Sequence, residues 1–185
     1  MTDNNKYKLA LEFATKKHQG QFRTGGLPYI THPVAVAEIL KQDGYGIDYQ
    51  IAGLFHDLLE DTDATQKQIL DLGGQSVLDA VKLLTKQENY VMQEYVKSIF
   101  SNPIAKAVKS ADRLHNLTCA TVCSEQFKQK YIIESIDWYL DFDKRILPAI
   151  INLIKSMQNP NDVLEKLKEK SAFELIKQQL KGSSD

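Results

Sequence analysis

The chain has 185 residues, of which 43% are hydrophobic and 25% are charged, a composition typical of a folded globular protein rather than a disordered one. Its formal net charge of −1 provides no electrostatic footprint for bulk nucleic acid or for an anionic membrane, and no stretch approaches the ~18 consecutive apolar residues of a membrane span. We therefore expect one cytoplasmic domain over residues 1–185, with neither a membrane nor bulk nucleic acid as a partner.

Apolar residues recur at helical spacing along the chain, and no run of alternating β-branched residues persists. The predicted fold class is therefore all-α, a single-domain bundle of many helices. The first helix is expected to begin after a cap at Asp3 or Asn4, and Pro148 is expected to end or kink the last long one. The helices predicted between these points cover residues 34–40, 51–60, 66–72, 77–84, 91–100, 104–117 and about 128–147.

The C-terminal helices, about residues 148–181, carry an amphipathic stripe that follows a break at Pro160. This stripe either folds back on the domain or pairs with a second copy of the chain in a homodimer. Its apolar residues are no denser than those of an ordinary surface helix, which favours packing within one chain. The motifs that carry chemistry all lie in about residues 1–147.

The apolar run IAGLFHDLLEDT, residues 51–62, contains four ionisable groups in six positions: His56, Asp57, Glu60 and Asp61. Burial of an unpaired charge is costly, and a bound metal ion is the most economical compensation for such a group. In one continuous helix, the four-residue spacing sets His56 beside Glu60 and Asp57 beside Asp61. One end of that helix then carries two metal ligands and two further carboxylates.

Two more hard ligands stand near predicted helix ends or inside an apolar helix. His32 precedes Pro33 at a helix start, and Asp112 lies within the apolar helix predicted over residues 104–117. Together, His32, His56, Asp57 and Asp112 form a ligand set that suits one divalent first-row metal, such as manganese, iron, cobalt or zinc. The alternative is that the two aspartates only pair with nearby cations or helix N-termini.

Other residues near these motifs are candidates for catalysis and substrate binding. Glu60 or Asp61 is placed to accept or return a proton. Arg23, ahead of a tight glycine loop, either stacks on a base, clamps a phosphate or is an ordinary solvated arginine. Asn116, one turn beyond Asp112, is expected to face the same cavity. His18 is expected to be a structural histidine at the end of the first helix.

Four stretches resemble the HD-superfamily phosphohydrolases, and within them the hydrolase domain of the RelA/SpoT-type alarmone enzymes. They are HQGQFRTGGLPYITHP at 18–33, LFHDLLEDT at 54–62, LLTK at 83–86 and VKSADRLHNL at 108–117. Their order and spacing are similar to those of the small alarmone hydrolases, such as the metazoan SpoT homologue. The resemblance implies an all-helical fold, one Mn²⁺ held by the ligand set, Glu60 and Asp61 serving the attacking water, and Arg23 stacking on guanine.

The activity that the resemblance implies is hydrolysis of guanosine 3′,5′-bis(diphosphate), ppGpp, to pyrophosphate and a guanosine 5′-phosphate. Two positions depart from the family pattern, because Thr24 replaces a basic residue and Cys119 belongs to a run, Leu117-Thr118-Cys119, that replaces Met-Arg-Thr. We expect both to line the substrate wall with Arg23 and Asn116. The alternatives are a phosphatase for another 3′-phosphorylated or pyrophosphorylated nucleotide or RNA end, and an idle nucleotide-binding or antitoxin-like module.

Overall fold

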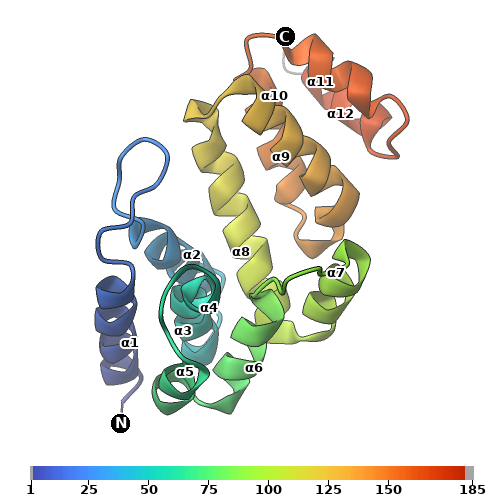
Figure 1. Cartoon of the computed structure of the whole chain (residues 1–185). Coiled ribbons are helices and arrows are strands. Elements are labelled where there is room, and N and C mark those ends of the chain that lie inside the picture. Colours follow the sequence, from blue (N-terminus) through green and yellow to red (C-terminus); the bar gives the residue numbers. More distant parts are fainter. Residues whose placement is uncertain (1, 182–185) are drawn as a thin grey trace. The chain divides into compact units, whose positions relative to one another are not determined.

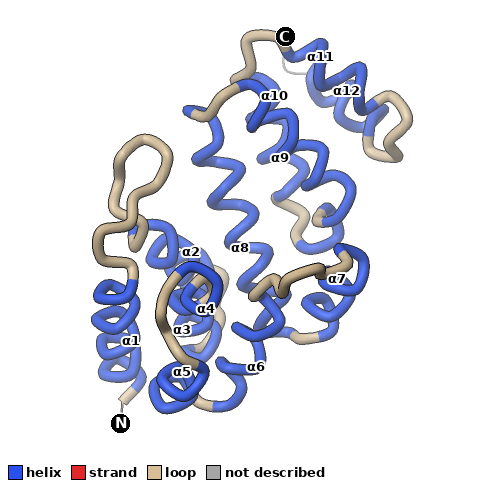
Figure 2. The backbone as a smooth tube through the Cα atoms, viewed as in Figure 1, coloured by secondary structure: helices blue, strands red, loops and turns tan. Residues whose placement is uncertain are grey.

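The computed structural model describes residues 2–181. Within these residues, every element of regular secondary structure is a helix, and there is no strand (Figures 1 and 2). The all-α prediction is confirmed. An isolated antiparallel bridge joins Phe22 to Pro28 in the loop after the first helix. The chain divides into two compact units, one up to Asp112 and one from Arg113 onward. Each unit is described by itself, and the single-domain organisation of the chain stays a prediction.

Helices α1 to α7 belong to the first unit, and α8 runs through the division. Thr2 caps α1 by accepting a hydrogen bond from the backbone N–H of Asn5, so the predicted caps at Asp3 and Asn4 are wrong and both residues lie in the first helical turn. The helices are α1 Asp3–Lys17, α2 Thr31–Gln42, α3 Ile47–Phe55, α4 Leu58–Asp61, α5 Gln66–Gly73, α6 Gln75–Leu84, α7 Met92–Ser101 and α8 Pro103–Cys119.

Helix α3 lies at the centre of the first unit, where it packs against α1, α2, α5 and α6. Its last five residues, 51–55, are all buried. Gly53 allows the closest approach to α2, because a Cβ added there would lie 2.9 Å from Leu40 Cδ1 and 3.3 Å from the Cα of Ala37. Because α3 packs this closely, His56, the residue that follows it, is also buried.

The prediction of one helix over residues 51–60 is wrong. Helix α3 ends at Phe55, α4 begins at Leu58, and His56 and Asp57 occupy the turn between them. The His56 ring bonds the carbonyl oxygen of Gly53 at 2.8 Å, a local side-chain contact that competes with helical bonding of the backbone. The break does not separate Asp57 from Asp61, because the backbone N–H of Asp61 donates to Asp57 O at 2.9 Å and both carboxylates lie near the Tyr29 hydroxyl.

The second unit contains η1 Ala120–Val122, α9 Glu125–Trp138, η2 Leu140–Phe142, α10 Ile146–Lys155, α11 Pro160–Leu167 and α12 Phe173–Lys181. The long helix predicted over residues 128–147 is wrong, because α9 ends at Trp138 and α10 begins only at Ile146. In the segment between them, the Asp143 side chain accepts a hydrogen bond from the backbone N–H of Arg145 at 2.8 Å, a local turn contact. Pro148 then lies in the first turn of α10, where no intrahelical donor is required, instead of ending a helix.

Helices α11 and α12 both pack against α10 within the second unit, so the amphipathic C-terminal stripe folds back on its own chain, as its pattern favoured. A homodimer stays a prediction. Among the described residues, no helix combines the length and the hydrophobicity that crossing a membrane requires.

Candidate metal centre

The four residues of the predicted ligand set converge in the first unit. His32 lies in the first turn of α2, His56 and Asp57 in the turn between α3 and α4, and Asp112 in α8. The Nε2 atom of His32 lies 3.2 Å from Asp112 Oδ1 and 3.8 Å from Asp57 Oδ2. The Nε2 atom of His56 lies 3.1 Å from Asp57 Oδ2 and 3.8 Å from Asp112 Oδ1. Both histidines and Asp112 are buried, and the Asp57 side chain is 22% exposed.

Local backbone and side-chain bonds fix these positions. At the start of α2, Thr31 Oγ1 donates to the carbonyl oxygen of Pro28, and the backbone N–H of His32 donates to that of Tyr29. Asp112 follows the buried Ala111 on α8, and its Oδ2 forms an ion pair with Lys109 Nζ at 2.8 Å. That contact leaves Oδ1 facing the two histidines.

His56 places one ring nitrogen where a cation can bind. Its Nδ1 donates to the Gly53 carbonyl, which can only accept, so Nε2 is directed toward the carboxylates. This buried Nε2 lies 3.1 Å from Asp57 Oδ2 without an aligned hydrogen bond. A positive charge at this point, either a proton on Nε2 or a metal ion, stabilises the contact.

The spacing of the ligand atoms also fits a single ion. Ligand atoms of His32, His56 and Asp57 all lie within 4.8 Å of one another, and Asp112 Oδ1 lies 3.2 Å from His32 Nε2 and 3.8 Å from His56 Nε2. With metal–ligand bonds of about 2.1 Å, neighbouring ligands lie about 3.0 Å apart in an octahedron and about 3.4 Å apart in a tetrahedron. The separations in the cluster, 3.1 to 3.8 Å, bracket the tetrahedral value and approach the octahedral one.

The electrostatics of the cluster agree with this geometry. Burial lowers the pKa of His32, whereas for His56 the charges of Asp57 and Asp112 outweigh burial and raise the pKa to about 9. Burial alone would raise the pKa values of the two aspartates, but His56 beside Asp57 and Lys109 beside Asp112 hold them below the usual range. Both carboxylates therefore stay ionised and attract a cation.

Tyr29 is a part of the site that sequence reasoning missed. Its hydroxyl donates to Asp57 Oδ2 at 2.7 Å and lies 3.3 Å from Asp61 Oδ2. Burial and then the charge of Asp57 raise the pKa of Tyr29, so the phenol remains a donor. Burial and then Asp57 also raise the pKa of Asp61. An aromatic residue between Pro28 and His32 in the motif PYITHP was the only sequence signal for this contact.

Glu60 and Asp61 differ in their surroundings, although both are exposed. Asp61 joins the metal cluster through Tyr29, whereas Glu60 Oε2 accepts a hydrogen bond from the backbone N–H of Lys86 at 3.0 Å. That bond ties α4 to the segment just after α6. The prediction that the two carboxylates serve the attacking water stays a prediction.

Arg23 lies on a short hairpin whose base adjoins the metal cluster. The backbone N–H of Arg23 donates to Leu27 O at 2.8 Å, and that of Tyr29 donates to Gln21 O at 2.9 Å. Gly25 at φ +99° and the glycine after it, at φ +85°, turn the chain. Gln21 Nε2 also donates to the carbonyl oxygen of Asp61 at 2.7 Å. Half-buried Arg23 therefore stands on a hairpin bonded to the end of α4.

The remaining predicted substrate contacts fall in different places. Thr24 is exposed on the same hairpin as Arg23. Asn116 and Cys119 lie in the second unit, where Cys119 Sγ is 3.6 Å from His115 Nε2, so their contribution to the substrate wall stays a prediction. His18 follows α1 as its cap, and its Nδ1 lies 2.7 Å from Gln21 Oε1, a structural contact as expected.

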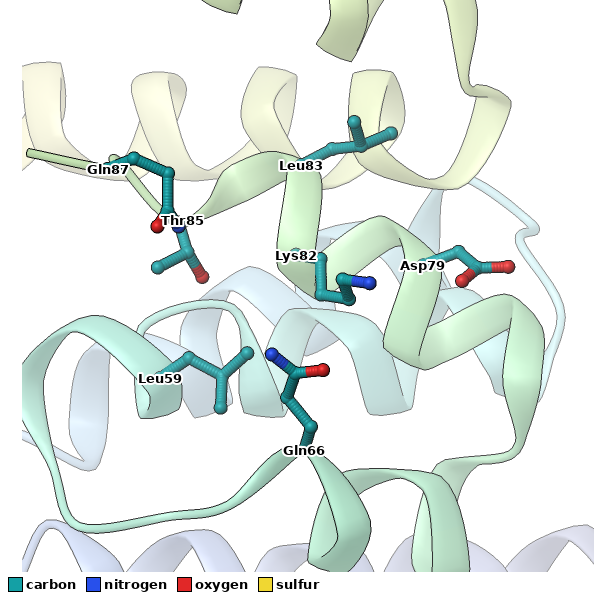
Figure 3. Close-up of a pocket in the computed structure, with 7 residues that line it drawn as sticks. All are labelled: Leu59, Gln66, Asp79, Lys82, Leu83, Thr85 and Gln87. Atoms are coloured by element: carbon teal, nitrogen blue, oxygen red, sulfur yellow. The ribbon is translucent and has the colours of Figure 1, made fainter. Parts of the chain in front are cut away.

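A separate groove opens on the first unit beside Glu60 (Figure 3). Leu59 and Gln66 point into it from one wall, opposite Lys82 on α6. Its volume is about 670 Å³, and none of the four predicted metal ligands is among the residues that line it: Leu59, Gln66, Asp79, Lys82, Leu83, Thr85 and Gln87. Leu59 precedes Glu60, and Lys86 lies between Thr85 and Gln87, so this groove borders the bond that holds Glu60.

Residues 10–146 match the model of a protein family described as the HD domain, which includes all four members of the ligand set. The chain belongs to the HD domain family. The resemblance found in the sequence motifs is confirmed at the level of the family.

Curated relatives of this HD-domain chain carry two kinds of name. A guanosine-3′,5′-bis(diphosphate) 3′-pyrophosphohydrolase of Haemophilus influenzae is 33% identical over 144 residues, which are 72% of this chain and 21% of that protein. The Spiroplasma citri protein of the same name is 36% identical over 142 residues, 70% of this chain and 19% of that protein. A probable GTP pyrophosphokinase of Mycobacterium leprae is 37% identical over 117 residues, 58% of this chain and 15% of that protein. The chain thus spans about a fifth or less of their lengths.

A solved structure shares the fold of the HD-domain chain. It is described by the words "A metazoan ortholog of SpoT hydrolyzes ppGpp and plays a role in starvation responses". The TM-score is 0.60, the sequence identity is 24%, and the match covers 94% of each chain.

Proposed function

We propose that the protein is a metal-dependent phosphohydrolase that removes the 3′-pyrophosphate of ppGpp. The observation that carries this proposal is the convergence of His32, His56, Asp57 and Asp112, with the buried Nε2 of His56 3.1 Å from Asp57 Oδ2 and 3.8 Å from Asp112 Oδ1. The names of the relatives from Haemophilus influenzae and Spiroplasma citri support ppGpp as the substrate.

The four side chains would hold one divalent cation, and we propose Mn²⁺. Two imidazole nitrogens and two carboxylate oxygens form a mixed donor set of the kind that suits divalent first-row metals better than calcium. When bound, such an ion supplies positive charge next to the phosphoryl oxygen that gains negative charge, and makes water a stronger acid.

The neighbouring carboxylates handle the proton in the proposed reaction. Water attacks the phosphorus bonded to the ribose 3′-oxygen, and Asp61, linked to the cluster through Tyr29, accepts its proton. The bond between the 3′-oxygen and phosphorus breaks, pyrophosphate leaves with the oxygen of the water, and the ribose 3′-oxygen takes up a proton. Glu60, fixed by the backbone of Lys86, adds a second acceptor next to Asp61.

Arg23 is the proposed nucleotide contact on the hairpin. Its planar guanidinium can stack on guanine, while the hairpin bonds at Leu27 and Tyr29 fix the backbone from which the side chain extends. Thr24 lies beside it, and Asn116 and Cys119 of α8 are proposed as further substrate contacts. Because Thr24 and Cys119 depart from the family pattern, a related 3′-phosphorylated nucleotide is the nearest alternative substrate.

A second candidate function follows from the name of the Mycobacterium leprae relative, GTP pyrophosphokinase. In that reaction pyrophosphate is transferred from a donor nucleotide to GTP rather than released into water. The four converging side chains favour the hydrolytic reaction, because Asp61 stands beside them, next to Tyr29, as a proton acceptor. An idle nucleotide-binding module would have no use for such a cluster.

The deciding experiment measures the products that the Mn²⁺-loaded protein forms from ppGpp. Release of pyrophosphate, abolished by EDTA and restored by Mn²⁺, is the expected result. Parallel reactions contain other 3′-phosphorylated nucleotides, or GTP with ATP. Turnover of another nucleotide alone would redirect the substrate, formation of ppGpp from GTP and ATP would favour the kinase, and silence throughout would favour the binding module.

A further inference from the structure

The hydroxyl of Tyr29 contacts the same carboxylate oxygen that faces the two histidines. Asp57 Oδ2 accepts its hydrogen bond at 2.7 Å and also lies 3.1 Å from His56 Nε2 and 3.8 Å from His32 Nε2. The bond therefore reaches the proposed ligand atom itself. A carboxylate rotates easily about its terminal torsion, so a fixed donor determines which direction that oxygen presents.

The donor is itself held in place on both sides. Its ring lies against the ring of His18, with centroids 4.8 Å apart, and meets the edge of His32 at 6.0 Å. Its backbone N–H donates to Gln21 O, and its carbonyl oxygen accepts from the backbone N–H of His32, each at 2.9 Å. The hydroxyl therefore approaches Asp57 from a fixed direction.

The phenol has one proton and two carboxylate neighbours. The bond to Asp57 is the shorter of the two, 2.7 Å against 3.3 Å for Asp61. Asp61 is thereby kept within reach of the ligand residue without becoming the principal acceptor. Tyr29 also closes the base of the hairpin that carries Arg23, because its backbone N–H donates to Gln21 O.

We propose that Tyr29 is a positioning residue of the metal centre, an inference that rests on the metal-dependent function proposed above. Its hydroxyl orients Asp57 Oδ2 toward the ion and holds Asp61 beside it. Its backbone anchors the Arg23 hairpin at the same point. One residue thus connects the metal ligands, the proton acceptor and the nucleotide-binding loop.

The test is the Mn²⁺ affinity of the Tyr29→Phe protein, measured by electron paramagnetic resonance of free Mn²⁺ during titration. The substitution removes the hydroxyl and leaves the ring and both backbone bonds. Loss of a partner that orients a metal ligand weakens affinity about 10- to 100-fold, and this is the expected change. The kcat for ppGpp should fall, while KM stays close to that of the wild type because the hairpin anchor remains.

Tyr95→Phe is the matched control. Tyr95 lies in the same unit, and its buried hydroxyl donates to the carbonyl oxygen of Leu84 at 2.8 Å. This variant should lose stability as Tyr29→Phe does but keep wild-type Mn²⁺ affinity. Equal weakening of metal binding in both variants would mean that the Tyr29 effect is only structural and would overturn the proposal.

The Asp61→Asn variant is an independent test that keeps the Tyr29 hydroxyl. With the bond to Asp57 intact, this variant should bind Mn²⁺ as the wild type does and lose turnover. Weakened binding in Asp61→Asn, or unchanged binding in Tyr29→Phe, would each overturn the positioning role. Absence of Mn²⁺ binding by the wild-type protein would instead overturn the proposed function.

Discussion

Asp112 contacts a different side chain with each of its two oxygens at the candidate metal centre. Oδ2 pairs with Lys109 at 2.8 Å, and Oδ1 lies 3.2 Å from His32 Nε2. Asp112→Asn retains the shape of the side chain but removes its charge, so we expect metal affinity and turnover to fall about 100-fold or more, beyond the usual effect of a residue that only orients a ligand. Metal content of the purified variant, measured by mass spectrometry, checks this.

Asp79→Asn serves as the control for this change, because Asp79 is an exposed aspartate of the same unit that lines the groove rather than the cluster. Full metal content in Asp112→Asn would remove Asp112 from the ligand set. Circular dichroism of both variants separates lost binding from lost structure, since Asp112 is also the partner of a half-buried lysine.

Glu60 allows a test of charge with its contact preserved. In Glu60→Gln the amide oxygen can still accept the hydrogen bond from Lys86, so only the proton-accepting capacity is lost. We expect unchanged metal content and a kcat for ppGpp lower by about 10² to 10⁴, the usual contribution of a general acid or base. Wild-type kcat in Glu60→Gln would assign that task to Asp61 alone.

The sequence predicted which four side chains come together, but not the contacts that orient them. His32, His56, Asp57 and Asp112 are hard donors in apolar surroundings, a combination that requires compensation whatever the fold. Tyr29 bonds a residue 28 positions away, which no local pattern encodes. Likewise, nothing in the helical period of residues 51–60 signals that the ring of His56 bonds Gly53.

At the scale of elements, the same limits explain which helices were predicted. Periodicity located α5 to α8 to within two residues at either end, because each has a clear apolar face. It failed where a polar side chain bonds nearby backbone between two helices, as His56 does between α3 and α4 and Asp143 does between α9 and α10. The spacing of apolar residues shows which face of a helix is buried. It does not show the side-chain bonds to the backbone that interrupt the helix.

Gly53 tests how tightly α3 must pack against α2. A methyl group there meets Leu40 at 2.9 Å and Ala37 at 3.3 Å, both buried. Overpacking costs about 1–3 kcal/mol and exceeds the gain of about 1 kcal/mol from replacing a helical glycine. We expect Gly53→Ala to lower the melting temperature by a few degrees. Gly46→Ala, where no atom lies within 4 Å of the added carbon, should change it far less, and equal changes would contradict this account.

Glu125 connects two elements of the second unit. Its Oε1 pairs with Lys128, and its Oε2 accepts from the backbone N–H of Gln158, beyond α10. The bond to Lys128 lowers the pKa of Glu125 below that of an ordinary glutamate. Since the pKa is lower in the folded state, this contribution to stability is complete above the unfolded pKa and is lost as pH falls through the folded pKa.

Replacement of Glu125 by glutamine should therefore make the unfolding free energy less dependent on pH in the acid range. Between about pH 6 and pH 3, a range that brackets the ordinary carboxyl pKa, the wild-type second unit should lose more unfolding free energy than Glu125→Gln. Urea unfolding followed by the fluorescence of Trp138, the single tryptophan and a residue of α9, reports on this unit. Parallel pH profiles for the two proteins would rule out a linked role for Glu125.

At the scale of the whole molecule, metal binding and folding should be linked through residues that are far apart in the sequence. His32 and Asp112 are 80 positions apart yet only 3.2 Å apart at Nε2 and Oδ1, so the cluster exists only in the folded first unit. A ligand at 100 times its Kd stabilises the folded state by about 2.7 kcal/mol, which raises the melting temperature of a chain of this size by about 5–10 °C.

We expect Mn²⁺ to raise the melting temperature of the wild-type protein by this amount relative to EDTA, as measured by calorimetry. His32→Ala should abolish the increase, because it removes a ligand that α2 contributes from outside the His56-Asp57 turn. An equal increase in His32→Ala would place the bound ion elsewhere in the molecule. No increase in either protein would mean that the four side chains hold no ion, and that proton sharing among them, with His56 charged, maintains the cluster.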